Sequence, residues 1–162
     1  MFPGLHARTT PDRPAVIAAE TGEVLTYRQL DDNSAALARV LHDRGLRRGD
    51  VVAVLSDNAA PVFEVYWAAH RSGLYITAIN HHLSAGEAAY IVKDCGARVL
   101  IASAALAELA CAVAREVDGV AELLAFGGEI PGFSRYGDAL AAAGPPLAEQ
   151  PCGAVMLYSS GT

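Results

Sequence analysis

Residues 49–79 have the sequence GDVVAVLSDNAAPVFEVYWAAHRSGLYITAI, and this stretch decides the fold class. Its first part, residues 51–55, is a continuous apolar run with β-branched side chains, which predicts a strand covered on both faces. Apolar residues then recur at helical spacing up to Gly73, and a second apolar run occupies residues 75–79. A strand, a helix and a strand in this order indicate parallel strands joined by a crossover helix.

The preceding residues predict a hairpin and a long helix. Two short apolar runs, residues 15–19 and 24–25, flank a turn that contains a glycine. Thr26 lies three residues before Gln29, so the two side chains can form a capping box at the start of a helix. Gly45 is expected to end this helix, because a left-handed residue is favoured at that position.

The same alternation continues after residue 79. Ser84 and Glu87 predict a second capping box, and the helix that they begin is followed by a strand at residues 99–102. Another helix, capped by Ser103, and a strand at residues 120–126 come next. We therefore predict a doubly wound α/β fold with a mostly parallel sheet flanked by helices.

The last part of the chain changes character. Residues 127–153 are rich in glycine and proline, which predicts a surface connection with one short helix at residues 134–142. Residues 154–157 predict a final strand. This strand leads into a small, hydroxyl-rich segment, Tyr158-Ser159-Ser160-Gly161-Thr162.

The hydroxyl-rich segment is the strongest candidate for a binding site. It follows the carboxyl end of a strand, where open α/β sheets place their ligands. Hydroxyl groups and backbone N–H groups there can surround phosphate oxygens. By itself an ordinary Ser/Gly turn is the commoner interpretation of four small residues, so the surrounding sequence has to decide.

Composition narrows the function classes. The 162 residues are 52% hydrophobic and carry a net charge of −6, which indicates one buried core and argues against a nucleic-acid or anionic-membrane surface. No apolar run reaches the length of a membrane span, and the start does not resemble a signal peptide. The three cysteines show no metal-ligand spacing, so we predict no metal site and reduced, buried thiols in a cytoplasmic protein: Cys95, Cys111 and Cys152.

Several short motifs occur in a recognisable order. They are Leu25-Thr26-Tyr27, Gly49-Asp50-Val51-Val52-Ala53, Tyr66-Trp67-Ala68-Ala69, Arg71-Ser72-Gly73, Ile79-Asn80 and Asp94-Cys95-Gly96-Ala97. In this order they resemble the N-terminal region of the AMP-forming acyl-CoA synthetases and their luciferase and peptide-synthetase adenylation relatives. The signature loop of that family is similar to aromatic-Ser/Thr-Ser-Gly-Thr-Thr-Gly-x-Pro-Lys-Gly, and residues 158–162 match its first five positions.

This resemblance implies a two-step reaction. A carboxylate attacks ATP to give an acyl-adenylate and pyrophosphate, and coenzyme A then displaces AMP to form a thioester, with Mg²⁺ accompanying the ATP. The residues that the resemblance assigns to the ATP phosphates are Ser159, Ser160, Gly161 and Thr162. Residues 71–75, Ile79-Asn80 and Leu83 look most similar to the fatty-acid–CoA ligases, which implies a fatty acid as the substrate.

The resemblance also implies that the chain is a partial domain. Residues 1–162 are expected to form the N-terminal part of the synthetase large domain, truncated inside the phosphate-binding loop, with the C-terminal domain and most catalytic residues absent. No residue of this chain is assigned a catalytic role. Such a chain is expected to be inactive. One alternative is a non-catalytic α/β module that binds a partner or itself through an exposed sheet edge; another is a flavodoxin-like nucleotide binder.

Other candidate residues have structural alternatives. The pair His81-His82, which departs from the Pro-Arg pair common at this place in the family, could bind a metal or contact the coenzyme. Adjacent residues point apart, so we favour a solvated turn. Arg71 could hold a backbone carbonyl or an acidic partner, and a surface ion pair is the favoured interpretation. Three aromatic residues could line a ligand pocket, but their helical spacing favours the core: Phe63, Tyr66 and Trp67.

Overall fold

A six-stranded parallel sheet forms the centre of the computed structural model, which describes residues 3–19 and 21–158. The strands lie in the order β7-β6-β5-β3-β4-β8, and every neighbouring pair is parallel. They are β3 (Val51–Leu55), β4 (Tyr75–Ile79), β5 (Ala97–Ser103), β6 (Glu122–Phe126), β7 (Ser134–Arg135) and β8 (Ala154–Val155). The predicted fold class is confirmed.

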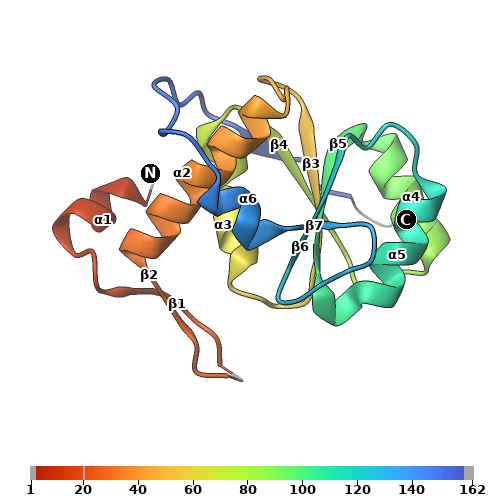
Figure 1. Cartoon of the computed structure of the whole chain (residues 1–162), viewed down its shortest axis with the longest axis horizontal. Helices are drawn as coiled ribbons and strands as arrows, with labels where there is room; N and C mark the ends of the chain where they lie inside the picture. Colours follow the sequence, from red (N-terminus) through yellow and green to blue (C-terminus); the bar gives the residue numbers. More distant parts are fainter. Residues whose placement is uncertain (1–2, 20, 159–162) are drawn as a thin grey trace.

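Helices cover both faces of this sheet (Figure 1). On one face lie α2 (Tyr27–Asp43), α3 (Pro61–Arg71) and α6 (Tyr136–Ala141), and on the other lie α4 (Ala85–Asp94) and α5 (Ala107–Glu116). All five residues of β3 are buried, because Val52 and Val54 enter the first core and the other three enter the second. The prediction of a strand covered on both faces is therefore correct.

The N-terminal elements lie outside the sheet. They are α1 (Gly4–Thr9) and a separate antiparallel hairpin of β1 (Pro14–Ile17) and β2 (Val24–Thr26), which confirms the predicted hairpin. The helix α1 was not predicted from the sequence. The structure places Pro3 at the N-cap of α1, where its missing N–H costs no helical hydrogen bond.

Both predicted capping boxes are present. Thr26 Oγ1 accepts a hydrogen bond from Gln29 N at 3.3 Å, and Gln29 Oε1 accepts one from Thr26 N at 2.9 Å. Ser84 and Glu87 make the same reciprocal pair at the start of α4. Gly45, after α2, has a φ of 89°, as its predicted helix-ending role requires.

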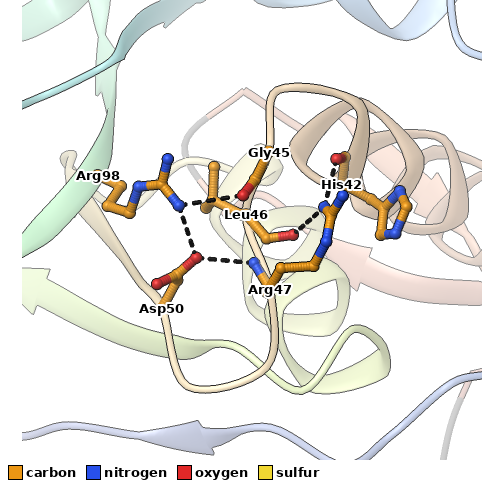
Figure 2. A network of polar contacts seen from close by, with 6 residues as sticks. All are labelled: His42, Gly45, Leu46, Arg47, Asp50 and Arg98. Carbon is orange, nitrogen blue, oxygen red and sulfur yellow. Dashed lines mark hydrogen bonds and ion pairs between the residues drawn. The ribbon is translucent and has the colours of Figure 1, made fainter.

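A polar network fixes the turn between α2 and β3, at the amino end of the sheet (Figure 2). The Asp50 carboxylate accepts hydrogen bonds from Arg98 Nη1 at 2.8 Å and from Arg47 N at 2.7 Å. Arg98 Nη1 also donates to the Gly45 carbonyl at 3.0 Å. Because Arg98 belongs to β5 and Asp50 directly precedes β3, the network joins the two central strands at their amino ends.

A buried carboxylate joins the three helices of the first face. Glu64 of α3 accepts hydrogen bonds from Asn33 Nδ2 and from Tyr136 Oη, each at 2.8 Å. Among the described residues, no arginine, lysine or histidine side chain forms an ion pair with the Glu64 carboxylate. Burial raises the pKa of the Glu64 carboxyl, and burial together with the Glu64 charge raises the pKa of the Tyr136 hydroxyl.

Several sequence predictions need correction. Residues 134–142 were expected to form one helix, but they begin with β7, a short edge strand that adds to β6. Phe63 is 48% exposed instead of lying in the core, because α3 turns its small residues Val65, Ala68 and Ala69 toward the sheet. Small side chains let the helix axis approach the strands closely.

Arg71 and the cysteines also differ from expectation. Arg71 is only 4% exposed, and it pairs with the Asp31 carboxylate and donates from Nη1 to the Asp31 carbonyl at 2.8 Å, so it is not a surface ion pair. Cys95 is buried, which raises the pKa of its thiol, whereas Cys111 is half-buried and Cys152 is exposed.

Among the described helices, none is long and apolar enough to cross a bilayer.

Candidate functional site

The final strand leads the chain to the carboxyl edge of the sheet. β8 runs parallel to β4, with Ala154 opposite Tyr75 and Val155 opposite Ile76. Met156 N then donates to the Ile76 carbonyl at 2.9 Å, so the next residues lie beside the end of β4. Tyr158 lies at this edge, which is where a ligand site is expected in an open parallel sheet.

The predicted phosphate-binding residues follow directly. Ser159, Ser160, Gly161 and Thr162 lie outside the described residues, so their role stays a prediction. The position of Tyr158 agrees with a site at the carboxyl edge of the sheet, and Tyr158 is also the first residue of the signature-like segment.

Close backbone contact holds the start of β8 in place. Gly153 N donates to the His70 carbonyl at 2.8 Å, and Ala154 N donates to the Leu74 carbonyl at 3.1 Å. A Cβ atom on Gly153 would collide with the carbonyl oxygens of Leu74 and Ala69. Glycine is required here for the close approach, not for an unusual φ, and it seats the strand against the corner between α3 and β4.

The Tyr158 side chain reaches across to α4. Its hydroxyl donates a 2.6 Å hydrogen bond to Asp94 Oδ2, and the Tyr90 hydroxyl lies 3.5 Å from Asp94 Oδ1. The hydrogen bond to the Asp94 carboxylate raises the pKa of the Tyr158 hydroxyl, because ionisation would leave two negative groups facing each other. In the sequence, Asp94 stands out only as part of a motif, since nothing local relates two residues 64 positions apart.

A hollow of roughly 570 Å³ lies between the end of β4, the first turns of α4 and Tyr158. Its walls are partly apolar, from Leu83 and Ile91, and partly polar, from Asn80 and Tyr90. Hollows of this size and mixed lining are typical of sites for small molecules. Glu87 also borders the hollow, but its carboxylate is engaged in the capping box with Ser84, which lowers its pKa.

The histidine pair lies in the turn at the rim of this region. His81 and His82 follow Asn80, whose Oδ1 accepts a hydrogen bond from His82 N at 3.0 Å, and His82 is exposed. The predicted turn is confirmed, although the two rings do not point apart: their centroids are 4.1 Å apart. Within residues 3–19 and 21–158, no three His, Cys, Asp or Glu side chains are grouped as a metal site would need.

The aromatic residues of α3 lie elsewhere. Tyr66 stacks on His70 with ring centroids 4.2 Å apart, and Phe63 and Trp67 border a separate hollow near the β1–β2 hairpin. These three residues therefore do not line the hollow beside Tyr158. Tyr66 and Trp67 are half-buried and pack against buried apolar residues, as the core prediction requires, whereas Phe63 is exposed.

Comparison with known proteins identifies the family. The sequence profile described as AMP-binding enzyme matches residues 5–162. The chain belongs to this family. It is 36% identical over 95 residues to the fatty acid–[acyl-carrier-protein] ligase ScoC of Streptomyces coeruleorubidus, a match that covers 59% of this chain and 18% of that protein.

Two further relatives extend this comparison. The chain is 36% identical over 104 residues to long-chain fatty acid transport protein 2 of Rattus norvegicus, covering 64% of this chain and 16% of that protein. Its fold matches that of a long-chain-fatty-acid CoA ligase, described as putative, from Rhodopseudomonas palustris with a TM-score of 0.85 and 26% identity, over 98% of this chain and 40% of that one. The chain thus has the fold of the N-terminal part of acyl-CoA synthetases, and its matches span less than a fifth of either curated relative.

Proposed function

We propose that the chain is the opening segment of an ATP-dependent fatty-acid–CoA ligase. The observation that carries this proposal is the position of Tyr158, which β8 delivers to the carboxyl edge of the sheet directly before the signature-like residues. Family membership supports the adenylate-forming part of the proposal. On this view residues 1–162 are part of a longer AMP-binding domain.

The chain's own contribution is to bind and orient phosphate groups. Ser159, Ser160, Gly161 and Thr162 supply three hydroxyls and four backbone N–H groups, a donor set that fits phosphate oxygens. ATP, held with Mg²⁺, supplies a pyrophosphate leaving group for activation of the carboxylate. Holding its charged oxygens in line is a matter of positioning and electrostatics. We assign no catalytic residue within this chain.

The substrate class is a fatty acid, supported by the names of the relatives. One curated relative is a fatty acid–[acyl-carrier-protein] ligase, and the matched structure is described as a long-chain-fatty-acid CoA ligase. The two names differ in the acceptor thiol. We propose coenzyme A as the acceptor, because the resemblance of residues 71–83 is to the CoA ligases.

Two assays test this function. We expect the reading frame to continue after Thr162 as Thr-Gly-x-Pro-Lys-Gly, and the whole encoded polypeptide to release pyrophosphate from ATP only when a fatty acid is present. Coenzyme A should then be consumed, whereas holo acyl carrier protein should not. Failure to release pyrophosphate with fatty acids of any length would contradict the proposal. The 162-residue chain alone should release none, and reproducible turnover by the pure chain would refute that part.

A second candidate function is a non-catalytic module that binds through its sheet edge. Leu157 is 82% exposed, and Val155 and Tyr75 are also exposed, so the β4–β8 side of the sheet presents apolar side chains. If this edge causes self-association, Leu157→Asp should lower the sedimentation coefficient of the chain at high concentration, while Leu5→Asp should not. Identical sedimentation of the unmodified chain and of both variants would exclude this candidate. A cytoplasmic location likewise stays a prediction.

A further inference from the structure

The order of the strands creates a crevice between β3 and β5. The chain places β4 on one side of β3 and β5 on the other, so the connections that leave the carboxyl ends of β3 and β5 diverge. The first connection enters α3 and the second leads to α5, and these two helices lie on opposite faces of the sheet (Figure 1). Open parallel sheets bind their ligands at such a switch point, outside the carboxyl ends of the strands.

A hollow of roughly 510 Å³ lies at this switch point. Its walls come from the loop after β3, the ends of β5 and β6, and the β1–β2 hairpin. Among the described residues, it shares no lining residue with the hollow beside Tyr158. A volume of this size suits a small organic molecule. The switch-point hollow is therefore a second candidate site, and its walls do not involve β8.

The walls of the switch-point hollow carry negative charge. Glu23, from the hairpin, and Asp57, from the loop after β3, both line it, and none of the described lining residues is an arginine, lysine or histidine. No described residue forms an ion pair with either carboxylate. Asp57 Oδ1 accepts a hydrogen bond from the neighbouring Ser56 Oγ, at 3.2 Å. Both carboxylates are therefore available to a cation.

Other acidic side chains of this fold are neutralised. Asp31, Asp50 and Glu122 each pair with an arginine. Two carboxylates without such a partner repel an anion and attract a cation. The five strands β4-β3-β5-β6-β7 have the flavodoxin-like order, whose ligand at the switch point is a phosphate-bearing nucleotide. The charge of this hollow argues against such a ligand.

A metal ion does not fit the hollow either. Divalent ions such as Ca²⁺ require about six or more oxygen ligands. In the part of the chain that the structure describes, no three His, Cys, Asp or Glu side chains are grouped as a metal site would need. The cation that these walls would accept is therefore an organic one.

The remaining wall is mostly apolar and offers one free donor. Ala59, Ala60, Ala105 and the buried Phe126 line the hollow. Ser103 is only 4% exposed; its Oγ accepts a hydrogen bond from Ala105 N at 3.3 Å, and no described residue accepts one from its hydroxyl. Because a buried donor without an acceptor is unfavourable, a ligand oxygen would be stabilised here.

We propose that the switch-point hollow binds a small organic ammonium ion with an apolar body. The ammonium group is attracted by the carboxylates of Glu23 and Asp57, the body contacts the alanines and Phe126, and an ether or hydroxyl oxygen accepts from Ser103. This binding activity is separate from the proposed ligase function, which assigns nothing to these residues.

Three probes with one common body test the ligand class. They are 2-phenoxyethylammonium, the neutral 2-phenoxyethanol and the anionic phenoxyacetate, and each is titrated into the ¹⁵N-labelled 162-residue chain. We expect saturable amide shifts at Asn58, Ser103 and Gly127. The ammonium probe should bind about fivefold more tightly than the alcohol, as two partly exposed ion pairs imply, and phenoxyacetate should bind most weakly. Amides of Asn80 and Tyr90, at the hollow beside Tyr158, should not respond.

Charge-removing variants test which groups recognise the ammonium. With Glu23→Gln and Asp57→Asn combined, the ammonium and the alcohol should bind equally well, while the affinity for the alcohol stays unchanged. Glu149→Gln is the matched control, because Glu149 is an exposed carboxylate that borders a different hollow. This variant should keep the preference for the ammonium. Unchanged amide shifts in β3 and β5 verify that each variant is folded.

A blocking variant tests the location. Ala105 is exposed and lines the hollow, so Ala105→Phe fills the space with little cost to the core. It should abolish saturable binding of all three probes.

Several results would overturn the proposal. They are an absence of saturable shifts at Asn58, Ser103 and Gly127, equal affinity for the ammonium and the alcohol, a preference that survives the loss of both carboxylates, and undiminished binding to Ala105→Phe. Shifts confined to Asn80 and Tyr90 would assign the probes to the other hollow and would overturn it as well. None of these results bears on pyrophosphate release, so the proposed function stands or fails separately.

Discussion

Replacing Gly153 with alanine should detach β8 from the sheet. An added Cβ would lie well inside 3.0 Å from the carbonyl oxygens of Leu74 and Ala69, a separation that real Cβ atoms essentially never show. Both obstacles are backbone atoms of α3 and the segment before β4, so neither can rotate away. The strand itself must withdraw, by a distance on the order of half an ångström or more.

The size of the effect follows from what holds the strand. Gly153 N donates to the His70 carbonyl at 2.8 Å, and a shift of that size stretches the bond beyond the range of an N–H···O bond. Overpacking costs about 1–3 kcal/mol, and each lost backbone bond costs about 0.5–1.5 kcal/mol. Because β8 lies at the sheet edge, it can detach as a unit. We therefore expect Gly153→Ala to lower the free energy of unfolding by about 1–3 kcal/mol.

The assays are urea unfolding and amide hydrogen exchange. Gly153→Ala should lower the unfolding midpoint and remove protection from the Ala154 and Met156 amides, while β3 and β5 amides stay protected. Gly137→Ala is the matched control, because a Cβ there meets no atom within 4 Å. It should be neutral or slightly stabilising, since alanine is favoured over glycine in a helix. Full protection of Ala154 in Gly153→Ala would refute the close-approach argument.

Three further predictions concern stability. Burial raises the pKa of Glu64 in the folded chain, so its stabilising contribution is complete below the unfolded pKa of about 4.3 and is lost as pH rises through the folded pKa. The unfolding free energy should therefore fall more between about pH 4 and about pH 7 in the unmodified chain than in Glu64→Gln, and equal pH profiles would contradict this. Arg71→Ala should lower the free energy of unfolding, measured in urea, by about 2–3 kcal/mol, because it removes the partner of Asp31. Arg28→Ala, at an exposed ion pair, should change that free energy little. Similar losses for both variants would show that the burial of the Arg71 pair does not matter. Thr26→Ala should lower the unfolding free energy by about 1 kcal/mol through loss of the α2 cap, measured by circular dichroism, and an unchanged midpoint would mean that the cap is not stabilising.

Local patterns predicted most of the elements. The apolar run of β3, the two capping boxes and Gly45 each depend on interactions within a few residues, so they are visible in the sequence. The prediction was wrong where a long-range contact decided the outcome. β7 is a strand because its two residues pair with β6, and Arg71 is buried because Asp31, on another helix, accepts its hydrogen bonds.

The candidate site divides in the same way. Residues 159–162 were predicted to bind phosphate from sequence alone, because their types and their place after a predicted strand are local properties, and this role stays a prediction. The contact between Tyr158 and α4 could not be identified from sequence, since the bond between Asp94 and Tyr158 joins residues 64 positions apart. Likewise, the need for glycine at residue 153 appears only where the strand meets α3 and β4.

Short-range patterns were sufficient to predict that this chain alternates strands and helices and reaches a hydroxyl-rich segment after its last strand, because hydrophobic period and capping depend on neighbouring residues. The strand order, the burial of Arg71 and the contact between Tyr158 and Asp94 became known only from the folded chain. These depend on which distant surfaces meet when the sheet assembles, and no local pattern encodes that choice.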